Sequence, residues 1–236
     1  MKNRMILVIA AICFVQQATA DLIETFQDGD YTHNPVWFVS NSPGSDEIRA
    51  DQQDPNNLVL AMHGTNTAHH RLATEVTTSW VGFQLSVDFR ADGNHNTDFQ
   101  LLSNLPNDTP PSLSMRWTRA DDASGLVLRN GGVDISSIAF DIDITNTWTT
   151  LSVWHDVETD LVSVRVTDAL TGLVLGSSTV SFGFDFSTAG DIGFVSLGAE
   201  ETSWQYFDNI QLTTVPSPGT LTGFALCCGC LLNRRR

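Results

Sequence analysis

The feature that most constrains this chain is an alternation of apolar and polar residues with a period of two, repeated in short segments. The segments at 83–89 (FQLSVDF) and 161–166 (LVSVRV) each place apolar side chains on one face and mostly polar ones on the other. This pattern is typical of half-buried β-strands, because successive side chains of a strand point to opposite faces. No convincing helical stripe accompanies it. The chain is therefore expected to be all-β.

Further segments have the same character and extend the pattern along the chain. They are residues 58–62, 72–76, 99–102, 113–117, 126–128, 148–154, 173–175, 192–197 and 204–212. Residues typical of turns separate them at 121–125 (DDASG), 130–132 (NGG) and 168–172 (DALTG). A dozen or so short strands at regular spacing predict a sandwich of two packed antiparallel sheets.

The start of the sequence differs from this middle part. Basic residues and an apolar run at 5–15 are followed by the small residues Ala18 and Ala20, as a signal peptidase requires. We therefore expect residues 1–20 to be a signal peptide and residues 21–213 to be one β-sandwich domain. All four cysteines lie in the terminal segments outside that domain, so we expect the domain to fold without a disulfide.

Residues 214–236 form a tail with three parts. A stiff segment of two prolines comes first, an apolar run at 219–232 follows, and three arginines end the sequence. The apolar run is shorter than the roughly 20 residues that a helix needs to cross a bilayer core. Arginines after such a run favour the cytoplasmic face. The tail is therefore expected to be a marginal membrane anchor.

The order of these three parts resembles the PEP-CTERM sorting signal of bacteria that carry an exosortase. The residues that carry the resemblance are Val215, Pro216, Ser217, Pro218, Arg234, Arg235 and Arg236. Ser217 departs from the namesake Glu between the prolines, and the tail resembles in particular the variants of the signal with Ser or Ala at that position. In that family the tail is recognised at the membrane and cut near the prolines, and the protein passes to the cell surface or an extracellular polysaccharide matrix. The resemblance implies an exosortase-type processing enzyme as a partner, and a simple membrane tail is the alternative.

The charge of residues 21–213 is one-sided. This region contains seven arginines, no lysine and all 27 acidic residues of the chain. Such a surface repels nucleic acid and anionic lipid, so we expect no nucleic-acid partner and contact with a membrane only through the tail. The same surface attracts calcium.

The two ends of the domain resemble the first and last strands of concanavalin A-like lectin/glucanase (laminin G-like) domains. The opening at 24–30 (ETFQDGD) is similar to their first strand, and 204–212 (WQYFDNIQL) is similar to the last strand, which returns beside the first. The resemblance implies a concanavalin A-like jelly roll. It also allows carbohydrate binding, in which one or two of the six tryptophans would stack on a sugar.

Motifs of known enzymes are absent from the sequence. A glycoside hydrolase on this fold would need two carboxylates close together, typically as Glu-x-Asp-x-x-Glu. The nearest string, 141–146 (DIDITN), has Asp first and Asn last, so Asp141 and Asp143 are interpreted as solvated side chains. We therefore expect a secreted, non-enzymatic protein with an adhesive or structural role. A degenerate glycoside hydrolase or polysaccharide lyase of the same fold is the alternative, and a matrix protein without a ligand is a third reading.

Calcium is the one cofactor that the sequence suggests. Asp92, Asn94, Asn96 and Asp98 place oxygen donors at every second residue, a spacing by which a curled loop surrounds a hard cation. The alternative is a polar hairpin loop between the strands on either side.

A second candidate calcium site combines residues from both ends of the domain. It consists of Glu24, Asp28 or Asp30 with Asp208, because related sandwiches tie the first and last strands through a structural ion. A histidine group at 63, 69 and 70 suggests a transition metal, but a solvated polar loop is the simpler interpretation.

Overall fold

A computed structural model shows the architecture of the predicted sandwich domain. The described residues are 22–33, 35–40, 44–64, 70–75, 80–92, 95–102, 113–120, 123–130, 133–140, 144–156, 158–181, 191–198 and 204–216. They form strands and turns with no helix, and so contain no helix long and apolar enough to cross a membrane. The all-β prediction is confirmed.

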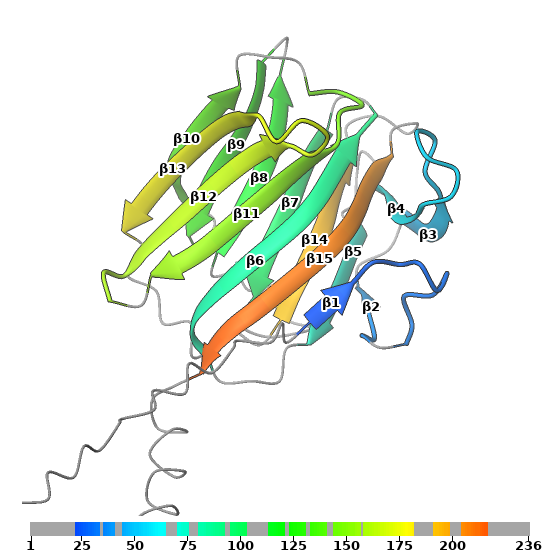
Figure 1. The fold of residues 1–236 in the computed structure, drawn as a ribbon, viewed down its shortest axis with the longest axis horizontal. Coiled ribbons are helices and arrows are strands. Elements are labelled where there is room, and N and C mark those ends of the chain that lie inside the picture. Colours follow the sequence, from blue (N-terminus) through cyan, green and yellow to red (C-terminus); the bar gives the residue numbers. More distant parts are fainter. Residues whose placement is uncertain are drawn as a thin grey trace, which may run out of the picture.

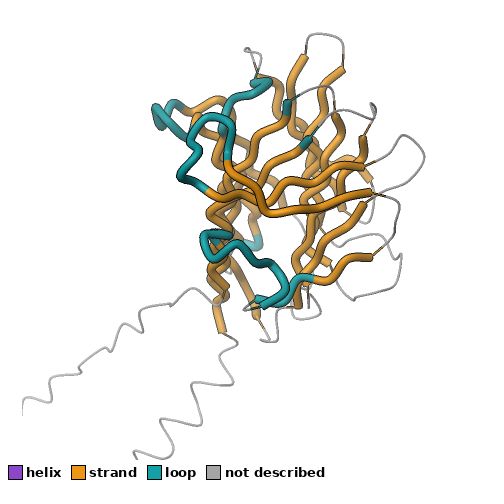
Figure 2. The backbone as a smooth tube through the Cα atoms, turned by 90° about the vertical axis from the view of Figure 1, so that its right-hand side faces the viewer, coloured by secondary structure: helices purple, strands orange, loops and turns teal. Residues whose placement is uncertain are grey.

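The strands form two antiparallel sheets packed face to face (Figures 1 and 2). The eight-stranded sheet has the order β13 (Val174–Ser181), β12 (Leu161–Asp168), β11 (Thr149–Asp156), β6 (Trp80–Ala91), β15 (Gln205–Pro216), β4 (Leu58–Gly64) and β3 (Gly44–Ala50), with β1 (Leu22–Glu24) beside β15. The seven-stranded sheet has the order β10 (Val133–Phe140), β9 (Ala123–Asn130), β8 (Leu113–Ala120), β7 (His95–Leu102), β14 (Asp191–Gly198), β5 (His70–Glu75) and β2 (Phe38–Ser40).

Among the described side chains, apolar residues of both sheets meet in the core between the sheets. The eight-stranded sheet contributes Phe83, Leu85, Val87, Phe89, Leu151, Val153, Val162, Val164, Val166, Phe207 and Leu212, and the other sheet contributes Leu126, Leu128, Ile138 and Phe140. Each fully buried side chain of this kind contributes roughly 1.5–3 kcal/mol. Burial of these faces fixes the register, because a slip of one residue would turn every apolar side chain outward.

One side of the sandwich is closed by contact between its two edge strands, β10 and β13. The hydroxyls of Ser136 and Ser178 lie 2.9 Å apart across this contact. Gly176 faces Ile138 so closely that a Cβ atom would overlap the γ-methyl group of Ile138. Glycine is therefore required here by the close approach of the two strands.

The first and last strands lie side by side, as predicted. Leu22 pairs with Leu212 and Glu24 pairs with Ile210. The first strand, however, ends at Glu24, whereas we predicted a strand over 24–30. Phe26 has a positive φ of 56° and Gly29 has one of 78°, so the chain turns immediately after Glu24.

Strands β6 and β7, which lie on either side of Asp92 in the sequence, do not form a hairpin, so the interpretation of a polar hairpin loop is wrong. Strand β6 belongs to the eight-stranded sheet and β7 to the seven-stranded sheet. The predicted polar loop from 62 to 70 is also shorter, because His63 lies in β4 and His70 lies in β5.

The outer face of the eight-stranded sheet carries a row of stacked rings and guanidinium groups. Arg90, only 1% exposed, has its Cζ atom 4.3 Å from the ring centre of Tyr206 and 5.3 Å from that of Trp148. Arg49 continues the row, with its Cζ atom 5.7 Å from the Tyr206 ring and 5.1 Å from the Trp204 ring. Cations above aromatic faces are attracted by the ring quadrupole, most strongly where water is excluded.

Asp51 balances the buried charge of Arg90. Its Oδ1 atom lies 2.8 Å from Arg90 Nη2, and its Oδ2 atom accepts a hydrogen bond of 2.9 Å from Trp148 Nε1. Asp51 is itself 3% exposed. One carboxylate thus joins the β3–β4 loop to the segment before β11.

We predict that Asp51→Asn lowers the free energy of unfolding by about 3–5 kcal/mol, because it leaves a buried guanidinium without a counter-charge. Urea unfolding at neutral pH measures this loss. The matched control is Asp134→Asn, since Asp134 contacts Arg129 at the same 2.8 Å distance but is 68% exposed. That control should lose no more than about 1 kcal/mol. Equal losses in the two variants would contradict a structural role for the Arg90–Asp51 contact.

Candidate ligand-binding pocket

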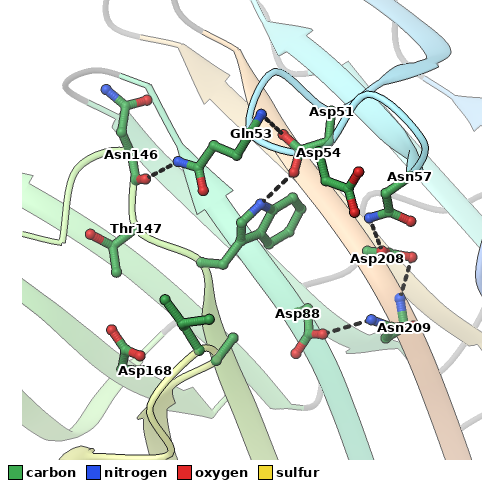
Figure 3. A pocket seen from close by; sticks show the side chains of 13 residues that line it. Asp51, Gln53, Asp54, Asn57, Asp88, Asn146, Thr147, Asp168, Asp208 and Asn209 are labelled. Carbon is green, nitrogen blue, oxygen red and sulfur yellow. Dashed lines mark hydrogen bonds between the residues drawn. The ribbon is translucent and has the colours of Figure 1, made fainter.

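A pocket with a volume of about 740 Å³ lies on the outer face of the eight-stranded sheet. Strands β6 and β15 form its floor, and three loops form its walls (Figure 3). The lining residues are Asp51, Gln53, Asp54, Asn57, Asp88, Asn146, Thr147, Trp148, Asp168, Ala169, Leu170, Asp208 and Asn209. Acidic and amide side chains dominate this set, and it contains no lysine, arginine or histidine.

The floor contains two carboxylates directly opposite each other on neighbouring strands. Asp208 of β15 pairs with Asp88 of β6, one position from the buried pair Phe207 and Phe89. Because side chains alternate along a strand, both carboxylates point away from the core. Like charges in this cross-strand arrangement are destabilising unless something bridges them.

A β-bulge supplies the bridge. The register between β15 and β6 shifts between Asp208 and Gln211, and Asn209 has a positive φ of 48°. At this position the Asn209 backbone N–H donates to Asp208 Oδ1 at 2.7 Å, and its side-chain Nδ2 donates to Asp88 Oδ2 at 2.8 Å (Figure 3). Asparagine tolerates the left-handed region better than most residues, which suits it to a bulge of this kind.

Burial raises the pKa of Asp208, and the negative charges of Asp88 and Asp51 raise it further. Hydrogen bonds from Asn57 and from the Asn209 backbone act in the opposite direction, because they stabilise the ionised form. Both carboxylate oxygens of Asp208 thus accept hydrogen bonds within the protein. This arrangement makes Asp208 a structural part of the floor.

The β3–β4 loop forms one wall. Asn57 donates from Nδ2 to Asp208 Oδ2 at 2.8 Å and accepts at Oδ1 from Gln27 Nε2 at 2.5 Å. Asp54 accepts at Oδ1 from the Asn56 backbone and is exposed. The sequence of this loop, DPNN at 54–57, is typical of a turn.

The segment before β11 and the β12–β13 turn form the opposite wall. Asn146 has a positive φ of 57°, donates from its backbone to Ala91 O and accepts at its own backbone O from Gln53 Nε2. In the turn, the Asp168 carboxylate accepts from the backbone N–H and the hydroxyl of Thr171. Leu170 is 92% exposed at the rim.

The pocket therefore offers mainly hydrogen-bond acceptors. Within the described part of the chain, Gln53 Oε1 and Asn209 Oδ1 have no hydrogen bond inside the protein, and the side-chain amide of Asn146 has none either. The indole of Trp148 adds an aromatic surface to the lining. Such a mixture suits a neutral or cationic ligand that is rich in hydroxyl or amine groups.

The second predicted calcium set is only partly connected to this pocket. Asp208 lies in the floor, but Glu24, Asp28 and Asp30 make local hydrogen bonds, to the backbone of Phe26, to the backbone of Asp30 and to Thr32 respectively. Burial raises the pKa of Glu24. The described residues include no group of three or more acidic, histidine or cysteine side chains placed to hold a metal. Calcium at this set stays a prediction.

The first predicted calcium set is divided between a crossover and a strand. Asp92 accepts from the Trp204 backbone at 2.6 Å and from the Tyr206 hydroxyl at 3.0 Å. Asn96 and Asp98 lie in the extended strand β7, and Asn94 lies outside the described residues. The curled loop that we expected is therefore shorter than 92–98, and calcium binding here also stays a prediction.

Parts of the sorting tail and the carboxylates considered for catalysis lie mostly outside the described residues. Val215 and Pro216 are the last residues of β15, whereas residues from Ser217 onward are not described. Asp141, Asp143 and residues 1–21 are not described either.

No protein-family model matches the sequence, and no curated protein matches it. Solved structures do resemble the fold. The carbohydrate esterase of the Shiga toxin-encoding bacteriophage phi24B superimposes with a TM-score of 0.59 at 14% identity, over 84% of this chain and 99% of that one. Lectin II from Ulex europaeus superimposes with a TM-score of 0.56 at 12% identity, over 83% and 99%.

The exoplasmic/lumenal domain of VIP36, in a form bound to Ca²⁺ and Man3GlcNAc, has a TM-score of 0.55 at 10% identity, over 76% of this chain and 86% of that one. At such low identity these similarities concern the fold. The chain has the concanavalin A-like β-sandwich fold found in lectins, as its end strands suggested.

Proposed function

We propose that this protein is a carbohydrate-binding β-sandwich of the cell surface or extracellular matrix and that the pocket on its eight-stranded sheet holds a sugar. The observation that carries the proposal is the lining of the pocket, which combines carboxylate and amide groups with an indole ring. Sugar hydroxyls both donate and accept hydrogen bonds, so side chains of this kind match them. The lectins among the similar structures share the fold and support the same reading.

The bound sugar would belong to an extracellular polysaccharide. This location rests on the predicted signal peptide at 1–20 and the PEP-CTERM-like tail at 214–236, with an exosortase-type enzyme as the processing partner. Calcium is a proposed cofactor, because the domain is strongly acidic.

An enzyme of the same fold is the second candidate function, since one similar structure is a carbohydrate esterase. Asp208 is the one pocket carboxylate for which a raised pKa is resolved, as a general acid would require. Both of its oxygens, however, already accept hydrogen bonds from Asn57 and Asn209. Because both oxygens of Asp208 are already engaged in these hydrogen bonds, we favour binding without catalysis. Release of acetate or of reducing sugar from a bound polysaccharide would contradict this interpretation.

We predict that a glycan array, probed with and without Ca²⁺, identifies a bound saccharide and that Asn146→Gly weakens its binding about fivefold. The substitution removes a free amide, and one lost hydrogen bond corresponds to about 1 kcal/mol. Glycine accepts the positive φ of Asn146 without strain, so the fold should be retained.

Gln52→Ala is the matched control, because Gln52 is exposed in the β3–β4 loop but does not line the pocket. Its affinity should equal that of the wild type. A glycan that binds both variants as tightly as the wild type would place the binding surface elsewhere on the molecule.

The processing proposal makes a separate prediction about mass. Protein recovered from its host should lack residues 219–236, because cleavage occurs near the proline motif. Intact-mass measurement decides this, and a retained Arg234–Arg236 end would favour the simple membrane tail.

A further inference from the structure

We infer that the pocket prefers a sugar unit with a free amine, such as a hexosamine without its acetyl group, over neutral and anionic sugars. This inference deepens the proposed carbohydrate-binding function and rests on it. It follows from the balance of charges and of hydrogen-bond donors in the pocket.

The charged side chains of the lining are all aspartates. Five aspartates line the pocket, and among the described residues only Asp51 has a cationic partner, the buried Arg90. Asp88, Asp208 and Asp168 are held by neutral donors from Thr150, Asn209, Asn57 and Thr171. Neutral donors leave the net charge in place. Burial is the main cause of the raised pKa of Asp208, and the negative charges of Asp88 and Asp51 add to it.

The uncharged groups of the pocket point to the same class of ligand. Gln53 Oε1 and Asn209 Oδ1 are carbonyl oxygens that have no hydrogen bond within the described part of the protein. An ammonium group has three donors and no acceptor, whereas a hydroxyl has one donor. An ammonium group therefore satisfies acceptors that a neutral sugar would leave partly unmatched.

The carboxylates lie on several sides of the pocket and do not converge on one point. Asp54 and Asp168 stand on opposite walls, with Asp88 on the floor between them (Figure 3). Asp54 accepts one backbone hydrogen bond and lies at the surface, so it can turn toward a ligand. Carboxylates on three sides of the pocket also repel a uronate or a sulfated sugar. Selectivity for an amino sugar over an anionic one would therefore come from repulsion of the anion as well as from attraction of the amine.

Titration calorimetry on the whole chain tests the inference with three oligosaccharides of equal length. They are oligomers of glucosamine, N-acetylglucosamine and glucose, and spermidine is added as an acyclic amine. We expect the glucosamine oligomer to bind at least fivefold more tightly than the other two sugars. The difference in affinity between the glucosamine oligomer and the neutral oligomers should decrease as the salt concentration rises, because exposed charges are screened over about 10 Å at 0.1 M ionic strength.

Two variants connect the preference to the pocket. Asp54→Asn and Asp168→Asn each keep the oxygen that accepts the local hydrogen bond and remove one charge. Each should weaken glucosamine binding about fivefold, the effect of one unit charge at roughly 4 Å in water. Each should leave the neutral sugars nearly unchanged. Glu158→Gln is the control, because Glu158 is an exposed acid in the turn between β11 and β12 and does not line the pocket.

The outcomes separate this inference from the function on which it rests. If the neutral oligomers bind as tightly as glucosamine, the amine preference is wrong and carbohydrate binding stands. If no oligosaccharide binds, both are wrong. Spermidine binding as tight as that of the glucosamine oligomer would also overturn the inference, because charge alone would then account for the affinity. Equal losses in Glu158→Gln and Asp54→Asn would show general attraction to an acidic surface instead of recognition in the pocket.

Discussion

The buried contact between Arg90 and Asp51 determines how the outer face of the eight-stranded sheet is built. A guanidinium that is 1% exposed requires a counter-charge and aromatic neighbours, and Asp51, Trp148 and Tyr206 supply them. Asp51 belongs to the loop after β3, and Trp148 precedes β11. The contact therefore holds together two loops that are far apart in the sequence, and these are two of the three loops that form the pocket walls. The pocket depends on this charge pair.

The local pattern predicted the strands of this protein well, but it did not predict which strands pair. Strands such as β6 and β12 show a clean alternation, because one face of each is buried. Strands β3 and β10 were missed, since Asp46, Glu47 and Asp134 interrupt their apolar positions and both strands lie at sheet edges. The assignment of β6 and β7 to different sheets is a property of the whole fold. A polar segment between two strands has the same composition in a hairpin and in a crossover.

The pocket was harder to predict than the fold. The sequence pointed to Asp208 as part of a calcium set that joins the first and last strands, and not as part of a pocket. It did not point to Asp51, Asp88 or Asn146, because their partners come from distant segments. A local signal did exist at Asn209. An Asn within an alternating strand, next to an Asp, is consistent with a left-handed bulge that turns two successive polar side chains to one face. The outward-facing residues Ser86, Asp88 and Arg90 of β6 are also polar. Outward-facing residues of a sheet that only contacts solvent are polar too, so this pattern does not predict a pocket.

The floor of the pocket is a feature that stability alone does not explain. Asp88 and Asp208 face each other across neighbouring strands, and partial burial makes the ionised state of Asp208 less favourable. Asn209 and Asn57 offset this cost with hydrogen bonds, but a neutral or apolar pair at these positions would need no such bridge. Local arrangements that reduce stability occur mainly where a protein binds or reacts. Two opposed carboxylates that accept hydrogen bonds from Asn57 and Asn209 lie at the bottom of an acceptor-rich pocket. They are most simply understood as a surface prepared for a ligand that brings hydrogen-bond donors with it.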